Sequence, residues 1–587
     1  MKHNIVRLVA SALVVAAVAT RFAGLGSKPM HHDEAIHAWL SRDIARGAGY
    51  EYNPVYHGPV LYHLEALVFV VAGTGEFRAR AVPAAFGVLA VWLAFTLLRR
   101  RLGDATALAA AFLVLVSPTL TYYSRFNSHD ILMIVFTIAM TAIPFEYAAT
   151  PDRSLLLWFA TALGLAVSTK LNAYFVVGAL TLHLVAYAAF ARAMGRPIFV
   201  WRFVQTHRSD LAKAAAFGAA VAAVAYESTF IHRILFQKET VAGAARTTME
   251  LASVAGFRHW AEMHRIQRVG GPFHFYLPIL AIYEPLVVAS FLGALFYYMR
   301  RRARFIVMLA ALVAIEIVGV SRLPPNSPVL QALRMERWHV VLASAWAVGG
   351  AWTVVSLWMA ERGYLACWVF LGVAEMLLYS YAGEKVPWLA AHILLPWLIV
   401  SAAFAVEAWR RVQDARLRIA MASAAAALLM LTLHGSWVLN TRNRIDPVEP
   451  MVQVEYADDV RRTLEMVRAL GDKVPDGDVV RVEGPMQWPF AWYLRDARVS
   501  YVERVPGSET VPVLIAAIGG AHDDELALRY EGRTLAYYRW SNWVDKVRAG
   551  DVGGLLRFMV FHRGWGEDTS VPFRVWIRKD LRELGSW

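Results

Sequence analysis

Thirteen apolar segments constrain the fold of this chain more than any other feature of its sequence. Each is near the roughly 20 residues that an α-helix needs to cross a bilayer. Helices and closed barrels are the structures that satisfy every backbone hydrogen bond in lipid, so the pattern predicts a polytopic α-helical membrane protein. The segments are 5–25, 81–98, 105–123, 130–148, 154–168, 171–191, 211–230, 275–299, 305–321, 339–359, 364–381, 388–409 and 417–439.

The composition agrees with a membrane protein. Of the 587 residues, 58% are hydrophobic and 18% are charged, a balance that is unusual for a soluble domain. The net charge of +13 does not predict a nucleic-acid partner, because most Lys and Arg residues form short runs between apolar segments, as membrane-flanking charges do. The single cysteine, Cys367, excludes an intrachain disulfide.

The basic residues predict the orientation. With the N-terminus in the cytoplasm, the predicted cytoplasmic pieces hold 20 Lys and Arg in 58 residues, whereas the opposite pieces up to residue 387 hold 17 in about 132. Cytoplasmic loops carry the excess of positive charge in membrane proteins. We therefore expect a multi-pass protein of the cytoplasmic membrane. The first segment also fits a secretory signal peptide, but it is long enough to span the bilayer.

The composition changes after residue 440. Short β-type runs at 478–484, 511–519, 533–540 and 573–579 alternate with helical pattern at 451–470 and 541–559. We predict a transmembrane domain at 1–440 and a soluble extracytoplasmic α/β domain at 441–587, which is large enough for its own core.

A polar stretch, Ser27–Pro83, follows the first apolar segment, and its predicted outer loop spans 26–80. Polar groups at a membrane boundary are expensive, so they favour a reaction site. A second predicted outer loop, 231–274, contains WAEMHRIQ and is expected to form an interfacial helix. Its histidines are His232, His259, His264 and His274.

Two acidic positions stand out. Asp33 and Glu34 directly precede the stretch AIHAWLSRDIA, which is expected to be a helix. An acid at this position caps the helix, and the same position holds a base in place beside a membrane cavity. Asp130 ends SRFNSHD and begins the fourth segment, near Arg125. Helix capping and a polar site at the outer face are compatible interpretations of both positions.

Lys170 lies in an apolar stretch, where a snorkelling lysine and a phosphate-binding lysine are both plausible interpretations. Glu384 and Lys385 fit either a weak surface ion pair or a substrate contact. His57 fits a metal ligand, a phosphate contact or a structural histidine. The nearby histidines permit a divalent metal, but no ligand spacing demands one.

Four motifs in this order resemble membrane glycosyltransferases of the GT-C type, nearest to the protein O-mannosyltransferase and aminoarabinose-transferase branch. YAGEKVPWLAAHILLPW is similar to the subgroup labelled flippase-activity-associated proteins of archaeal-type N-glycosylation. The resemblance covers about residues 1–440. The motifs are DEAIHAWLSRDIARG, HGPVLYHLEALVFVVAGTGEFRARAVPAAFG, TYYSRFNSHDILM and GLAVSTKLNAY.

The resemblance implies a role for each site. Asp33 stands at the catalytic acidic position with Glu34 beside it, and Asp130 stands at the second acidic position. Arg125 and Lys170 match basic positions near the lipid phosphate. Relatives often have Lys-Pro-Pro where this chain has His57-Gly58-Pro59, which replaces a fixed cation with a group that is mostly neutral at pH 7.

The implied activity is transfer of a sugar from a polyprenyl-phosphate donor to an extracytoplasmic acceptor by one inverting displacement. Two other classes also fit the polar residues: a lipid-linked sugar flippase and a non-catalytic component of a glycosylation pathway. Transporters often show inverted repeats and polar residues at the bilayer midplane. This sequence shows no repeat, and its polar residues cluster at one predicted surface.

Overall fold

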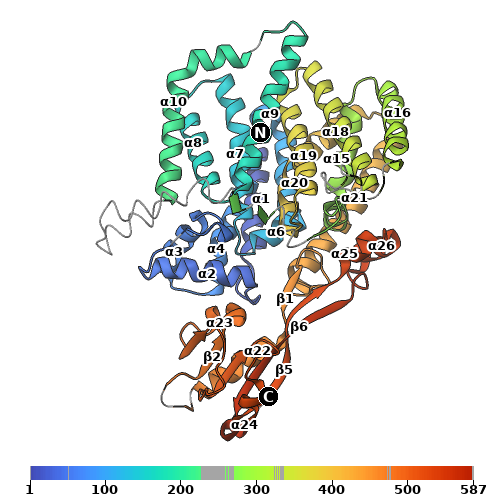
Figure 1. Ribbon diagram of the computed structural model, residues 1–587. Helices are drawn as coiled ribbons and strands as arrows, with labels where there is room; N and C mark the ends of the chain where they lie inside the picture. Colours follow the sequence, from blue (N-terminus) through green and yellow to red (C-terminus); the bar gives the residue numbers. More distant parts are fainter. Residues whose placement is uncertain are drawn as a thin grey trace.

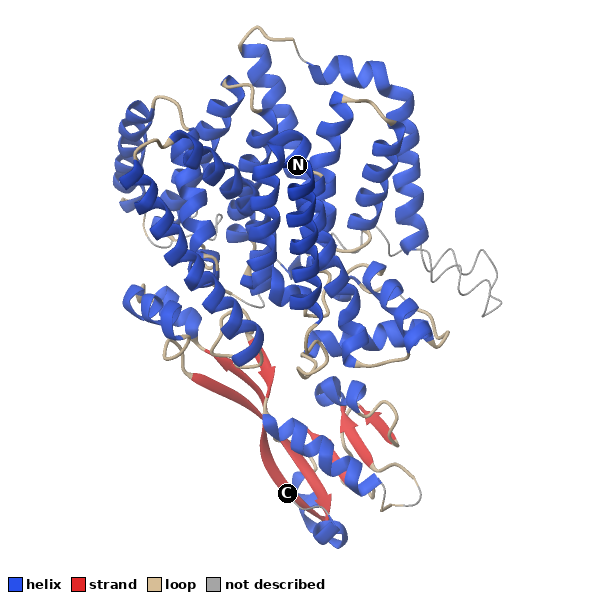
Figure 2. Ribbon diagram, turned by 180° about the vertical axis from the view of Figure 1, so that it is seen from behind, coloured by secondary structure: helices blue, strands red, loops and turns tan. Residues whose placement is uncertain are grey.

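A computed structural model of the protein shows a large helical part joined to a smaller part built on a β-sheet (Figures 1 and 2). The two parts are stacked end to end, and the sheet part follows the helical part in the chain. The structure describes residues 2–584 except 51, 198, 227–257, 260–261, 264–269, 323, 325–326, 328–329, 331–335, 472 and 475–476.

The helical part extends from α1 to the short π-helical turn η3 (Val438–Arg442), and most of its buried apolar side chains form one large cluster. Its helices are α1 (Lys2–Phe22), α2 (His32–Ala45), α3 (Val60–Ala72), α4 (Glu76–Thr96), α5 (Arg99–Val116), α6 (Pro118–Ser124), α7 (Asp130–Ala149), α8 (Arg153–Val167), α9 (Asn172–Ala193), α10 (Phe199–Tyr226), α14 (Tyr276–Tyr283), α15 (Pro285–Tyr298), α16 (Arg302–Ser321), α18 (Arg337–Met359), α19 (Gly363–Tyr381), α20 (Ala390–Arg411) and α21 (Ala415–Trp437).

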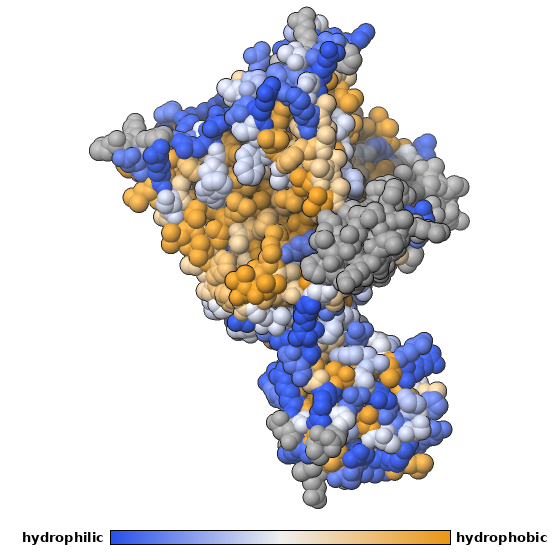
Figure 3. All heavy atoms as spheres, turned by 90° about the vertical axis from the view of Figure 1, so that its left-hand side faces the viewer, coloured by the Kyte–Doolittle hydropathy of each residue, from blue (hydrophilic) through white to orange (hydrophobic). Residues whose placement is uncertain are grey.

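Among the described residues, 8 helices are long and apolar enough to cross a membrane, or up to 10 if each bent pair forms one span. Apolar side chains cover the flank of the helical part in Figure 3, with polar side chains above them and over the sheet part below. The predicted polytopic helical membrane fold with a C-terminal α/β part is confirmed. The predicted count of thirteen spans is not.

Two bent helix pairs meet at a buried carboxylate. Helices α5 and α6 are bent by 62° at their junction, and α14 and α15 by 115°. Glu284, at the second break, accepts hydrogen bonds from the Ser117 hydroxyl (2.6 Å) and the Thr119 backbone N–H (3.1 Å) at the first. Each break frees backbone groups, and this contact satisfies one of them inside the bundle.

The predicted outer loop 26–80 is mostly ordered helix. It contains α2, a 3-10 turn η1 (Pro54–Tyr56) and α3, which lie across the end of the bundle that faces the sheet part (Figure 1). The backbone N–H of Gly58 donates to the carbonyl of Thr169 (3.0 Å). A Cβ at Gly58 would lie 2.0 Å from the Ser168 carbonyl oxygen. Gly58 therefore lets the η1–α3 turn contact the backbone just before Lys170.

We expect Gly58→Ala to destabilise the protein by about 1–3 kcal/mol, because the added methyl group overlaps a backbone carbonyl. The matched control is Gly178→Ala in α9, whose added Cβ meets nothing within 4 Å and gains helix propensity. Thermal unfolding of the two purified full-length variants measures the difference. A Gly58→Ala midpoint equal to that of the control would contradict the close approach.

The sheet part contains six strands in the order β1-β5-β6-β4-β2-β3. Strand β2 pairs in parallel with β3 and β4, and the remaining pairs are antiparallel. The strands are β1 (Val454–Tyr456), β2 (Val480–Glu483), β3 (Val499–Val502), β4 (Val513–Ala516), β5 (Tyr530–Ser541) and β6 (Asp568–Arg578).

Helices α22 (Asp458–Gly471), α23 (Gln487–Tyr493) and α24 (Asp523–Arg529) flank the sheet, and α22 and α23 contribute to its apolar core. Two further helices, α25 (Trp543–Arg548) and α26 (Val552–Phe561), differ: Trp543, Val547 and Phe558 join the core of the helical part. The division at residue 440 stays a prediction, and these two helices tie the segment after it to the bundle.

Candidate active site

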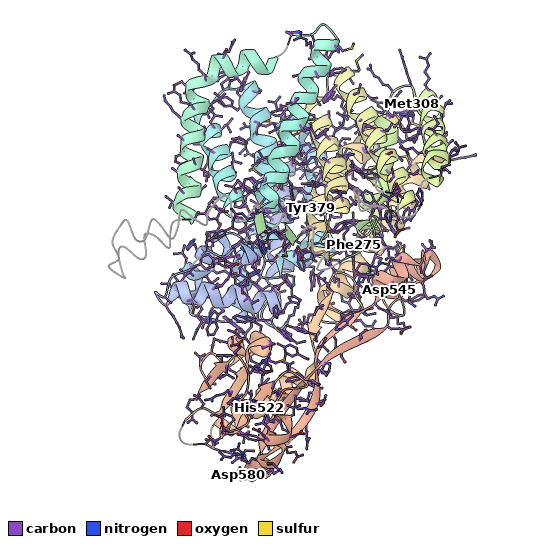
Figure 4. All side chains as sticks on the ribbon, in the orientation of Figure 1. Phe275, Met308, Tyr379, His522, Asp545 and Asp580 are labelled. Atoms are coloured by element: carbon purple, nitrogen blue, oxygen red, sulfur yellow. The ribbon has the colours of Figure 1, made fainter. Side chains whose placement is uncertain are left out.

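A cavity of about 640 Å³ lies where the helical part meets the sheet part. Tyr379, one of its lining residues, is at the end of the bundle nearest the sheet part in Figure 4. Its walls come from the start of α2, η1, the turn before α7, the start of α9, the α19–α20 connection and α23. The polar lining residues are His32, Asp33, His37, His57, Ser128, His129, Asp130, Lys170, Asn172 and Glu384.

Asp33 reaches the cavity from the first turn of α2. The expectation that Asp33 caps this helix is wrong: the cap is His31, whose Nδ1 accepts from the Asp33 backbone N–H (3.2 Å), and Glu34 completes a capping box. A carboxylate in the first turn is still favoured by the positive end of the helix. The Asp33 side chain is 39% exposed, so solvent or a substrate reaches it.

Glu34 has a different environment from its neighbour. It is fully buried, and its two oxygens each accept from the Arg80 guanidinium at 2.7 Å. The backbone N–H of Asn127 also donates to Glu34 (2.8 Å). Burial alone would raise the pKa of Glu34, but the Arg80 charge outweighs it and lowers the pKa to about 2. Glu34 thus joins α2, α4 and the turn before α7, and it is not among the cavity-lining residues.

We expect Glu34→Gln to destabilise the fold at pH 7 by about 3–5 kcal/mol, because Arg80 is left as a buried, uncompensated charge. Because the folded-state pKa is lowered, the contribution of Glu34 is present above its ordinary value of 4.5 and is lost as pH falls toward 2. The gap between the unfolding midpoints of wild type and variant should therefore narrow from pH 5 to pH 3.

Glu465→Gln is the control for this prediction, because Glu465 is 59% exposed in a pair with Arg461 that contributes about 0.3–0.5 kcal/mol. A Glu34 variant as stable as this control at pH 7 would contradict the role of the Arg80 contact.

Asp130 and Lys170 form a buried ion pair at the cavity wall. Lys170 Nζ lies 2.7 Å from Asp130 Oδ1, and His392 Nε2 lies 2.9 Å from the same oxygen. All three side chains are buried, and Asp130 and Lys170 line the cavity. A pair this deep persists only with good geometry and further hydrogen bonds. The arrangement fixes the ammonium group at the edge of the cavity.

His57 lies in the same wall, in a strained backbone conformation. Its φ is +66°, a region that non-glycine residues rarely adopt. Burial and then the nearby Lys170 charge hold the pKa of His57 well below its ordinary value. The rings of His37 and His57 approach His129 edge-on at 5.0 and 5.3 Å. His57 therefore adds a neutral imidazole to the cavity.

Two of the predicted basic residues bind backbone carbonyls instead of facing the cavity. Arg125 Nη1 donates to the carbonyls of Thr20 (2.9 Å) and Ala23 (2.8 Å) at the end of α1. Lys385 Nζ donates to three carbonyls at the end of α19, Ser380 among them (2.6 Å). Burial lowers the pKa of Lys385 to about 7. Neither is among the lining residues, whereas Glu384 is.

A divalent metal was left open by the sequence. In the parts of the chain that the structure describes, no group of three or more His, Cys, Asp or Glu side chains is arranged to hold one. Most of the predicted interfacial helix at 231–274 lies outside the described residues, including His232 and His264.

Several residues of this site were not predicted from the sequence. His392 lies in an apolar segment, where an ionisable residue is itself a signal of function. His37 and His129 sit inside the motifs already quoted. Trp488, which lines the cavity from α23, carried no signal, because it is far from the other lining residues in the chain.

One family model matches part of this chain. Residues 56–207 match the family dolichyl-phosphate-mannose-protein mannosyltransferase. The resemblance to the GT-C superfamily is confirmed. The matched segment includes His57, Arg125, Asp130 and Lys170 but begins after Asp33. The narrower subgroup stays a prediction, and no curated protein matches this chain.

Solved structures with a GT-C fold are similar to this chain at low identity. ArnT from Cupriavidus metallidurans bound to undecaprenyl phosphate has 17% identity and a TM-score of 0.47, with 98% of this chain and 99% of that chain covered. The oligosaccharyltransferase AglB from Archaeoglobus fulgidus, in complex with an inhibitory peptide and a dolichol-phosphate, has 14% identity and a TM-score of 0.45, covering 88% and 69%. The S. cerevisiae Pmt1-Pmt2 complex bound to the sugar donor has 22% identity and a TM-score of 0.31, covering 40% and 34%.

Proposed function

We propose that this protein is a membrane glycosyltransferase that moves a sugar from a polyprenyl-phosphate donor to an extracytoplasmic acceptor. The observation that carries the proposal is one cavity lined by both the Asp33 carboxylate and the Lys170 ammonium group. The first is suited to take a proton from an attacking group, and the second to bind a leaving phosphate. The match of residues 56–207 to the dolichyl-phosphate-mannose-protein mannosyltransferase family supports the same chemistry.

The reaction is a single displacement. An acceptor hydroxyl or amide nitrogen attacks the anomeric carbon of the donor as Asp33 takes its proton. The bond between that carbon and the phosphate oxygen breaks, and the bond electrons leave with the polyprenyl phosphate. Lys170 stabilises the charge that grows on the departing phosphate, in a water-poor wall where charge interactions are stronger than in water. One displacement inverts the anomeric configuration.

The surrounding residues position these two groups. Asp130 and His392 hold the Lys170 ammonium group through the contacts at 2.7 and 2.9 Å. Glu34 and Arg80 hold the start of α2, which carries Asp33. In this account Glu34 and Asp130 are positioning residues, and Arg125 and Lys385 stabilise helix ends.

The donor's lipid tail fits the apolar side of the cavity. The lining residues Tyr174, Phe175 and Tyr381 are each 40–42% exposed, at the start of α9 and the end of α19. Exposed aromatic side chains of this kind are typical of the membrane interface. The charge asymmetry of the predicted loops supports an extracytoplasmic position for this end of the bundle and for the sheet part.

A transfer assay tests the proposal against a flippase. The full-length protein in lipid vesicles is given radiolabelled polyprenyl-phosphate sugars from host membranes, with an envelope extract as acceptor. A glycosyltransferase moves the label from the lipid to the acceptor and releases polyprenyl phosphate. A flippase moves intact labelled lipid across the vesicle membrane, and that outcome would overturn the proposal.

A further inference from the structure

The cavity has a wall that the proposed reaction does not use. Of its described lining residues, Trp488 comes from the sheet part. Its backbone carbonyl accepts a hydrogen bond from the Tyr537 hydroxyl, and its ring meets Trp39 of α2 edge-on at 6.0 Å. The indole is half-buried, so one part is fixed by neighbours and another faces the cavity.

The sheet part also fixes a second ring in this wall. His32 lines the cavity next to Asp33, and its Nδ1 lies 3.0 Å from the Tyr456 hydroxyl and 2.5 Å from the Tyr538 hydroxyl. The two tyrosine rings are stacked, with centroids 5.0 Å apart. Strands β1 and β5 therefore set the orientation of the imidazole beside the proposed base.

Further contacts hold α23 against the helical part. The Tyr493 hydroxyl accepts from the Met30 backbone N–H (2.7 Å), and Trp492 Nε1 donates to Glu76 (3.1 Å). These contacts come from the helix that carries Trp488. Trp488 and His32, which together form the aromatic wall of the cavity, are therefore both held in place by contacts between the sheet part and the helical part.

We propose that Trp488 and His32 form an acceptor subsite for a sugar ring, so that the acceptor of this protein is a glycan. This inference rests on the proposed glycosyl transfer. The donor phosphate binds at Lys170, in the wall made by α7 and α9. The aromatic wall lies next to Asp33, on the side of the cavity that faces the sheet part. A flat indole fits the C–H face of a pyranose ring, and the adjacent carboxylate and imidazole suit its hydroxyl groups.

An extended peptide fits this wall less well. Peptide strands are recognised through backbone N–H and C=O groups as well as side chains. At the start of α2, the Asp33 and Ala35 N–H groups already donate to the Nδ1 atom and carbonyl of His31. The wall presents rings and side-chain acceptors instead, which is the surface a sugar requires.

Saturation-transfer NMR tests the subsite without any donor. The probes are the methyl glycosides of α-mannose, α-glucose, α-galactose and β-N-acetylglucosamine, with the peptide Ala-Ser-Thr-Ala as the competing acceptor class. The full-length protein in lipid nanodiscs should saturate the ring protons of at least one glycoside. We expect about tenfold weaker binding in Trp488→Ala and partial recovery in Trp488→Phe.

Phe561→Ala is the matched control, because it also removes an aromatic ring from the part of the chain after residue 440. Phe561 is 58% exposed and does not line the cavity. Equal binding in wild type and Trp488→Ala, saturation of the peptide alone, or saturation of no probe would overturn the sugar subsite. Sugar binding that depends on Trp488, in a protein that transfers no label, would instead contradict the proposed transferase activity.

Discussion

Asp33→Asn should lower sugar transfer by about 100- to 10,000-fold, the usual contribution of a general base. The amide keeps the size of the side chain but cannot take the acceptor's proton. Asp33 is partly exposed and lies in a first turn that His31 and Glu34 already cap, so the fold should tolerate the change. Initial rates with radiolabelled donor measure the loss, and thermal unfolding checks the fold.

The control for Asp33→Asn is Asp43→Asn, on the same helix. Asp43 is also partly exposed, at 33%, and its nearest ion-pair contact is Arg42 at 3.9 Å. It is not among the lining residues, and its variant should transfer sugar at the wild-type rate. Equal rates in the Asp33 and Asp43 variants would remove Asp33 from the mechanism.

Lys170→Met should lower transfer by about 100- to 1,000-fold, because it removes a charge-assisted contact to a leaving group whose charge grows in the transition state. It should also destabilise the protein by about 3 kcal/mol, since it leaves Asp130 buried without its ammonium partner. A lysine that only snorkelled to the interface would predict neither loss, whereas Lys170 is held by Asp130 at 2.7 Å.

A double variant separates the two effects of Lys170. Lys170→Met with Asp130→Asn removes both charges of the pair, so most of the lost stability should return while transfer stays low. Lys170→Arg should recover only part of the activity, because a planar guanidinium presents its charge differently from a compact ammonium. If the stable double variant transferred sugar at the wild-type rate, Lys170 would not be the partner of the donor phosphate.

The helical segments could be predicted because hydrophobicity and length are local properties. The segments at 130–148 and 388–409 correspond to α7 and α20. The breaks inside 105–123 and 275–299 were missed, although Pro118 and Pro285 stand where each second helix begins, a position that proline favours. Which side of each break is buried depends on the helix that packs against it, so the local sequence does not indicate it.

The roles of the charged residues were harder to predict, because charge in a sequence does not show direction. Asp33 and Glu34 are adjacent, but successive residues on a helix point about 100° apart, so one lines the cavity and the other contacts Arg80. Arg125 looked like a phosphate ligand, but it binds the carbonyls at the end of α1. Such contacts join residues about 100 positions apart, which a single sequence does not reveal.

The most direct test of the account is the stereochemistry of transfer, followed by proton NMR of the anomeric signal with the full-length protein and polyprenyl-phosphate sugars from host membranes. A single displacement at Asp33 and Lys170 predicts a product with the anomeric configuration opposite to that of the donor, formed together with free polyprenyl phosphate. A product with retained configuration would contradict this single displacement. A donor that stays unchanged during incubation with active acceptor extract would also contradict it.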